Sequence, residues 1–163
     1  MITDSLEEFQ LFAELALALG GFTGVAAAFG GRDREFRRIE VARITGVFWF
    51  AGISLVDALL VISLAHAGFS ASETYSVASF VAGLLVLVTA SLQLPPVVRL
   101  YRASESTTSG GFIVLAICFM ASLVVFNLWA SLVSRESWPL VCGISSQLVW
   151  GLWMFARLLL RPN

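Results

Sequence analysis

The sequence has no lysine, little charge and a single histidine, and each of these shortages excludes a class of function. All basic residues of this 163-residue chain are arginine, so no lysine Schiff base to retinal, pyridoxal phosphate or a carbonyl substrate can form. Because His66 is the one histidine, a bis-histidine haem within the chain is also excluded. Charged residues make up 13% of the chain and hydrophobic residues 58%, whereas ordinary soluble domains carry about 25% charged residues. This is the composition of a membrane protein.

Cysteine is scarce too, and the motifs of common enzymes are missing. Cys118 and Cys142 lie alone in separate apolar segments, which argues against a membrane thiol oxidoreductase with a paired dithiol. We expect both to be packed free thiols. The sequence contains no H-E-x-x-H, no G-x-S-x-G and no glycine-rich phosphate loop. We therefore expect no enzyme activity and no bound metal or cofactor.

Long apolar segments fill most of the chain, and each is long enough to cross a bilayer as a helix. A transmembrane helix needs about 20 apolar residues. Five segments meet this requirement, namely 8–30, 43–67, 74–100, 111–134 and 138–160. The connections are short, so consecutive segments should run antiparallel. The expected fold is an all-α membrane bundle of five helices in a single domain, residues 1–163.

The arginines predict how this bundle is oriented in the membrane. Cytoplasmic ends of membrane helices collect positive residues. All arginines except Arg135 lie in the first connection, in the third connection or near the C-terminus. We therefore expect the N-terminus outside and the C-terminus inside. Trp129 and Trp138 near the outer boundary, with Tyr101 near the inner one, fit the aromatic belts of membrane proteins.

The first connection carries a cluster of arginines with two possible roles. Arg34, Arg37 and Arg38 either determine the topology or bind anionic lipid headgroups. Each basic residue near a negative leaflet contributes about 1 kcal/mol. Asp33 and Glu35 are interleaved with them and reduce the local positive charge, which favours the topological role.

One face of the first segment consists of small residues. Gly20 and Gly24 form a G-x-x-x-G motif, which Ala16 and Ala28 extend to a stripe, and Gly21 lies on the same small face. Such faces let membrane helices approach closely. The face could pack against another helix of the same chain, or against a second copy or a different membrane protein.

The same region also carries a resemblance. The stretch "GFTGVAAAF" (residues 21–29) follows acidic Glu14 and precedes an arginine-rich turn, and "LVWGLWMFARLLL" (residues 148–160) lies near the C-terminus. Both are similar to small multi-span inner-membrane proteins of bacteria that have no assigned function. The resemblance implies a bacterial inner-membrane location and no particular activity.

Four polar side chains interrupt the apolar segments at a similar depth. Glu14, Asp57, Asn127 and Gln147 lie roughly 9–15 Å below the outer boundary at 1.5 Å per residue. An ionised carboxylate at this depth costs at least about 2.5–3.5 kcal/mol, so it should face protein or water and tend to be protonated or paired. We expect Glu14 and Asp57 to face the bundle interior together.

Three functions are compatible with these residues. Glu14 and Asp57, with Asn127 and Gln147 as neutral ligands, could form the cation or proton site of an oligomeric channel or transporter. Asp57 could instead be hydrogen-bonded to Asn127 or Gln147 and only fix the register of the helices. The third possibility is a non-catalytic membrane subunit or scaffold that docks a partner. Expected partners are the bilayer with its anionic lipids, other copies of the chain or a membrane protein, and no nucleic acid.

Overall fold

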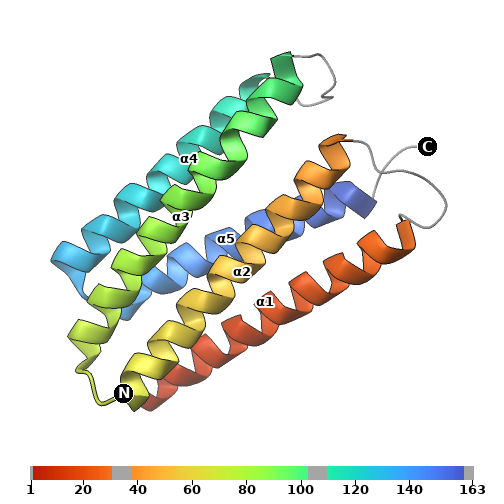
Figure 1. The fold of residues 1–163 in the computed structure, drawn as a ribbon. Helices are drawn as coiled ribbons and strands as arrows, with labels where there is room; N and C mark the ends of the chain where they lie inside the picture. The colour runs from red at the N-terminus through yellow and green to blue at the C-terminus, as the bar shows by residue number, and fades with distance from the viewer. Residues whose placement is uncertain (1, 31–37, 103–109, 160–163) are drawn as a thin grey trace.

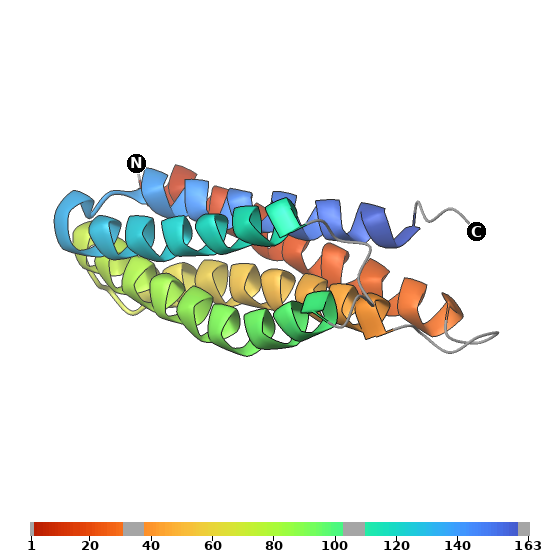
Figure 2. The same cartoon turned by 90° about the horizontal axis from the view of Figure 1, so that it is seen from above.

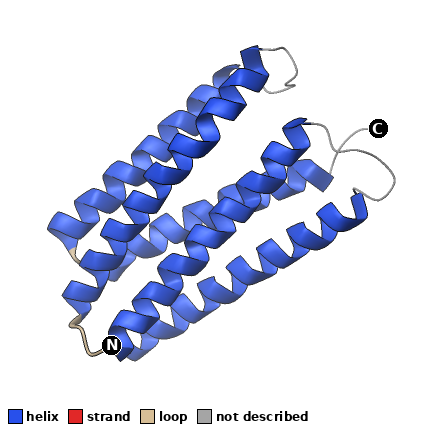
Figure 3. Ribbon diagram, viewed as in Figure 1, coloured by secondary structure: helices blue, strands red, loops and turns tan. Residues whose placement is uncertain are grey.

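The computed structural model describes residues 2–30, 38–102 and 110–159. These residues form five long helices and one short π-helical turn, and no strand occurs among them (Figure 3). The helices are α1 (Ile2–Gly30), α2 (Arg38–His66), α3 (Ala71–Arg102), α4 (Gly110–Trp129) and α5 (Ser137–Leu159), with the π-helical turn η1 (Ala130–Ser134) between the last two.

All five helices are long and apolar enough to cross a membrane. The apolar spans are Leu6–Phe29, Glu40–His66, Ala71–Arg99, Ile113–Ser134 and Ser137–Leu159. The five expected segments are thereby confirmed, each within a few residues at both ends. Helices form here because a bilayer offers no partner for backbone N–H and C=O groups, which an α-helix satisfies internally.

Helix α2 is the centre of the bundle and packs against α1, α3 and α5. Helix α4 packs mainly against α3, so these two form a hairpin that runs beside α2 and α5 (Figure 1). Seen from above, α4 and α5 lie on one side of the bundle and α2 and α3 on the other (Figure 2). Helix α1 begins at one end of the bundle, and α5 ends at the other (Figure 1).

The core of the bundle is built largely from small side chains. Alanines from α1, α2 and α3 are almost completely buried, among them Ala16, Ala51, Ala58, Ala78 and Ala82. Small residues bring membrane helices close together, and van der Waals contacts then replace the hydrophobic effect that lipid cannot supply.

The two described turns at the N-terminal end of the bundle are closed by local hydrogen bonds. Between α2 and α3, Gly68 has a positive φ of 86°, and Ser70 and Glu73 form a capping box in which the Ser70 N–H donates to the Glu73 carboxylate at 3.0 Å and the Glu73 N–H donates to the Ser70 hydroxyl oxygen at 3.4 Å. At the end of η1, the N–H of Arg135 donates to the carbonyl of Ala130 at 2.9 Å. The Ser76 hydroxyl of α3 donates to the Ser131 carbonyl at 2.8 Å and ties this turn to α3.

The cysteines differ in one respect from what their sequence context suggests. Cys118 and Cys142 are free, as expected, but both are exposed on the outside of the bundle. The expectation of packed thiols is therefore wrong. A lipid-facing helix surface is as apolar as a protein core, so an apolar context does not show that a cysteine is buried.

Candidate functional site: the polar cluster around Asp57

Asp57 lies in the middle of α2 and has no exposed surface. It shares one side of this helix with Phe50, Ser54 and Val61, which are also buried. The spacing of three, four and seven residues places these side chains on one face. Because that face points into the bundle, the carboxyl group is enclosed by protein and does not face lipid.

Gln147 of α5 is the polar side chain that lies across the helix interface from Asp57. It is 1% exposed, and its Oε1 accepts a hydrogen bond of 3.4 Å from the Ser54 hydroxyl, one turn before Asp57. Although Gln147 lies close to Asp57, neither carboxyl oxygen of Asp57 makes a hydrogen bond of regular geometry. The carboxyl group is therefore buried without the bonds that usually accompany burial of a polar group.

Asn127 of α4 is the second buried amide of the cluster. Its Nδ2 donates to the Leu123 carbonyl at 2.8 Å, whereas its Oδ1 is buried with no hydrogen-bond partner. The amide packs over Gly143 of α5, where an added Cβ would lie 3.3 Å from Oδ1. Gly143 is one turn from Gln147, so α5 brings the two amides to neighbouring levels.

Several hydroxyl groups of α3 are also buried without partners. Ser79, Thr74 and Thr89 are at most 2% exposed, and their hydroxyls make no hydrogen bond. A buried hydroxyl in a helix can instead donate to the carbonyl four residues earlier, as the Thr23 hydroxyl of α1 does to the Leu19 carbonyl at 2.7 Å. The sequence did not single out Ser54, Thr74 or Ser79, although the position of Ser54 three residues before Asp57 could have indicated it.

Glu14 lies level with Asp57 but points away from it. Gly20 faces Ala51 across the α1–α2 interface. Glu14 is six residues before Gly20, and Asp57 is six residues after Ala51. Because α1 and α2 are antiparallel, Glu14 and Asp57 lie at the same level. The side chain of Glu14 is nevertheless exposed, whereas Asp57 is fully buried. The expectation that both carboxylates face one interior pocket is therefore wrong.

The small face of the first helix is only partly used within the chain. Gly20 and Gly24 pack on α2, because Cβ atoms there would lie 3.9 Å from Ala51 and 3.7 Å from Phe48. Gly21 and Ala28 are exposed. The inward side of α1 instead carries Phe9, Ala13, Ala16, Leu19 and Thr23.

The arginine cluster of the first connection falls mostly outside the described residues. Arg34 and Arg37 lie in that undescribed segment, and Arg38 is exposed at the start of α2. The described arginines other than Arg135, namely Arg38, Arg43, Arg99, Arg102 and Arg157, all lie at the end of the bundle where α2 begins and where α3 and α5 end.

Comparisons with known proteins add nothing to these observations. No protein-family model matches the chain, and no match was found among curated proteins or solved structures. Within the described part of the chain, no three His, Cys, Asp or Glu side chains come together as metal ligands. Any function must therefore be argued from the residues themselves.

Proposed function

We propose that the protein is a small multi-pass membrane transporter or channel for protons or monovalent cations, with Asp57 as the residue that carries the charge. The observation behind this proposal is the fully buried carboxyl group whose two oxygens lack regular hydrogen bonds. An ionisable group inside a membrane helix bundle is costly and usually serves a function. Gln147 is its neutral neighbour, and the buried amide of Asn127 packs on Gly143, one turn of α5 away from Gln147.

The alternative role of holding helices together accounts less well for these contacts. A polar side chain stabilises a membrane bundle through the hydrogen bonds that it makes between helices. Ser54 and Gln147 make such a contact, but Asp57 adds no regular bond of its own. An amide or a hydroxyl would hold the helices without burying an ionisable group, so a structural role alone does not explain an aspartate.

The chemistry of the cluster favours a singly charged ligand. One carboxylate can balance one positive charge, and Gln147, the polar side chain recorded beside Asp57, adds only a neutral amide. Divalent cations such as Ca²⁺ are usually held by six to eight oxygens that include several carboxylates. A proton or an ion such as Na⁺ therefore matches the site better than a divalent cation does.

We propose further that the chain works as a homo-oligomer in a bacterial inner membrane. Glu7, Glu14, Gly21 and Ala28 repeat every seven residues, and all four are exposed on the outer side of α1. Leaving Glu14 in hydrocarbon would cost at least about 2.5–3.5 kcal/mol as the carboxylate. A second copy covering this face would take Glu14 out of contact with lipid and could offer its carboxyl group a hydrogen-bond partner, and the same argument would apply to a different membrane protein that docks there.

The bacterial location follows from the resemblance of residues 21–29, and the orientation follows from the arginines. With the arginine-rich end of the bundle in the cytoplasm, the N-terminus lies outside. A C-terminal reporter of a type that works only in the cytoplasm should then be active, and one of a type that works only outside should be inactive. The opposite result would contradict the proposed orientation.

Ion flux into liposomes tests the transport proposal. Vesicles containing the wild-type protein should take up protons or Na⁺ under a gradient faster than empty vesicles, and Asp57→Asn should lower this rate at least about tenfold, because the neutral amide keeps the volume but cannot carry the charge. Glu136→Gln is the matched control, since it removes an exposed carboxylate from the turn before α5. Equal flux through wild type and Asp57→Asn, or none through either, would refute transport by Asp57.

A further inference from the structure

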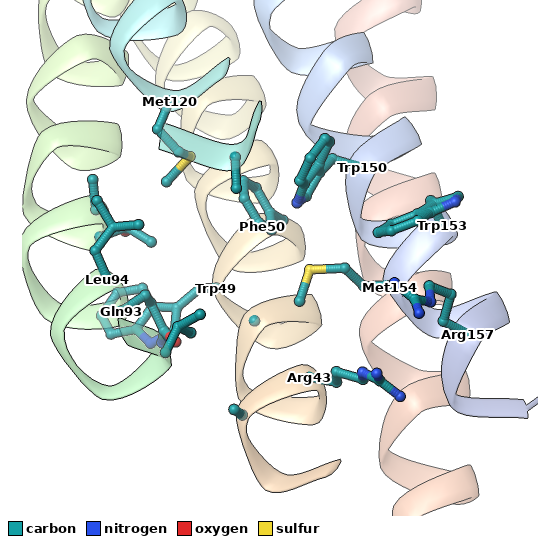
Figure 4. A pocket seen from close by; sticks show the side chains of 16 residues that line it. Arg43, Trp49, Phe50, Gln93, Leu94, Met120, Trp150, Trp153, Met154 and Arg157 are labelled. Carbon is teal, nitrogen blue, oxygen red and sulfur yellow. The ribbon is translucent and has the colours of Figure 1, made fainter. Parts of the chain in front are cut away.

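A cavity between helices α2, α3, α4 and α5 extends from the arginine-rich end of the bundle towards Asp57. It is partly open and has a volume of about 110 Å³ (Figure 4). One water molecule needs about 10–15 Å³ of such a volume, so the cavity has room for several. On α2 its wall ends at Phe50, which is seven residues before Asp57.

The lining changes from polar to apolar along the cavity. Arg43, Gln93 and Arg157 line it towards one end, and Phe50 and Met120 line it towards the other (Figure 4). Water enters a cavity that offers polar partners, whereas a narrow apolar section stays dry. The arginine-rich half of the cavity should therefore be hydrated, and the half nearer Asp57 should exclude water.

The charges around the mouth of the cavity are of both signs. Arg43 and Arg157 are half-buried, and the guanidinium of Arg157 stands 5.0 Å over the ring of Trp153. Glu40 is fully buried one turn before Arg43 on the same face of α2, and both Glu40 and Arg157 take part in further interactions. The two arginines alone therefore do not decide which ions enter.

Phe50 closes the inner end of the cavity together with apolar side chains of the neighbouring helices. It is 6% exposed and belongs to one apolar cluster with Val86 of α3 and with Met120 and Leu123 of α4. Helix α5 also approaches it closely, since a Cβ at Gly151 would lie 3.5 Å from the Phe50 Cβ. An apolar constriction of this kind blocks ions because it excludes water.

Polar groups begin again directly behind Phe50. Ser54 is one turn further along α2, and its hydroxyl donates to Gln147 at 3.4 Å. Asp57 follows after another turn, with a carboxyl group that makes no regular hydrogen bond. The seven residues from Phe50 to Asp57 correspond to about 10 Å along the helix. The side chain of Phe50 thus separates the cavity from the polar cluster over a short distance.

The opposite side of Asp57 is packed with apolar side chains. Val61 is one turn after Asp57 on α2 and belongs to the larger apolar core, together with Phe9 of α1 and Leu140 of α5. All three are at most 1% exposed. A path from Asp57 to that end of the bundle would have to pass through this core. The described cavity leads only towards the arginine-rich end.

We infer that this cavity is the route by which protons or Na⁺ reach Asp57 from the arginine-rich end, and that the side chain of Phe50 is its gate. A rotation of the Phe50 ring would join the hydrated half of the cavity to Ser54 and Gln147. Met120 and Met154 line the cavity beside this ring, and methionine adapts its shape easily, so they can make room for it. The inference rests on the proposed transport role of Asp57 and adds the side of access and the residue that controls it.

Single cysteines in the full chain can test this route. Cys118 and Cys142 are first replaced by serine, because both are exposed. Ser54→Cys then places one thiol behind Phe50, and the exposed positions Arg102→Cys and Glu136→Cys mark the two ends of the bundle. A charged, membrane-impermeant methanethiosulfonate is added to sealed membrane vesicles of either orientation. It reacts with the thiolate, which forms only where water reaches the cysteine.

Ser54→Cys should react only when the reagent is on the side from which Arg102→Cys reacts. Phe50→Ala should speed this reaction at least about tenfold, because it removes the apolar barrier. Val61→Cys is the matched control on the same face of α2, and Phe50→Ala should leave its reaction slow. Met120→Ala shortens the opposite wall of the constriction and serves where Phe50→Ala does not fold.

Three results would overturn the inference. The first is reaction of Ser54→Cys from the side of Glu136→Cys. The second is a rate at Ser54→Cys that neither Phe50→Ala nor Met120→Ala changes. The third is an equal acceleration at Val61→Cys, which would mean that the whole bundle has loosened and that Phe50 is not a gate.

Ion flux through the same variants separates this inference from the transport proposal. Phe50→Ala should raise the flux, and Asp57→Asn should abolish that gain. The expected pattern of cysteine reaction without flux in any variant would refute transport and leave the water route to Asp57 standing. Flux that depends on Asp57, with Ser54→Cys reacting from the side of Glu136→Cys, would refute the route alone.

Discussion

Asp57 and Glu14 are both carboxylates in helices long enough to span a membrane, but they differ in their surroundings. Asp57 is enclosed by α2 and α5, with Ser54 and Gln147 beside it, whereas Glu14 is exposed at the same level on the outside of α1. That both residues lie at a similar level along the bundle was expected from the sequence. The direction of Glu14 was not, because α1 has small or apolar residues on every side, so periodicity could not show which side faces protein.

The packing of Asn127 over Gly143 gives a prediction at this scale. A Cβ at Gly143 would lie within 3.4 Å of both amide atoms of Asn127. Gly143→Leu should therefore overpack the cluster and lower the free energy of unfolding by about 1–3 kcal/mol. The measurement is thermal or denaturant unfolding of the purified protein in detergent.

Gly52→Leu is the matched control for that measurement. Gly52 is exposed on α2, and a Cβ there would meet no atom within 4 Å. The same substitution should leave stability nearly unchanged at this position. Equal effects at both glycines would mean that the contact between Asn127 and Gly143 does not contribute to stability.

At the scale of helices, the sequence allowed the number and limits of the spans to be predicted closely. Bilayer thickness sets a length of about 20 apolar residues, and the turns between spans carry local signals. The turn before α3 is an example, where Ser70 and Glu73 have the spacing of a capping box. Span lengths and turn motifs depend only on residues close together in the sequence, so they can be predicted without knowledge of the fold.

The cavity could not be predicted, because it depends on how the helices pack against each other. The cavity near Arg43 and Arg157 needs four helices at a particular separation. Its signal in the sequence is faint, although Arg43, Gly46 and Phe50 on α2 and Trp150, Met154 and Arg157 on α5 each recur at helical spacing. Because lipid and protein interiors are equally apolar, hydropathy does not distinguish a cavity wall from a lipid-facing surface.

For the whole molecule, the exposed side of α1 leads to a prediction about assembly. Glu14 and Gly21 lie two turns apart on this side, and a Cβ at Gly21 would meet no atom of its own chain within 4 Å. Gly21→Leu should therefore leave the fold intact but separate the copies. We expect the mass measured in detergent by light scattering to fall from that of an oligomer to that of a monomer.

The control for assembly is again Gly52→Leu, which enlarges an equally open position on α2. This variant should keep the mass of the wild-type oligomer. A wild-type protein that is already monomeric, or an oligomer that Gly21→Leu leaves unchanged, would argue against an interface between copies along α1.

The transport proposal depends on a carboxyl group that loads and releases a proton or cation while buried in the bundle. Infrared difference spectroscopy of the full chain in lipid observes this group directly, through the C=O stretch of a protonated carboxyl. When the buffer is changed from acidic to alkaline, or when Na⁺ is added, the wild-type protein should lose this C=O band. The loss should be absent in Asp57→Asn and should remain in Glu14→Gln. A difference spectrum that is the same in wild type and Asp57→Asn would show that Asp57 exchanges no charge, and would contradict the proposal.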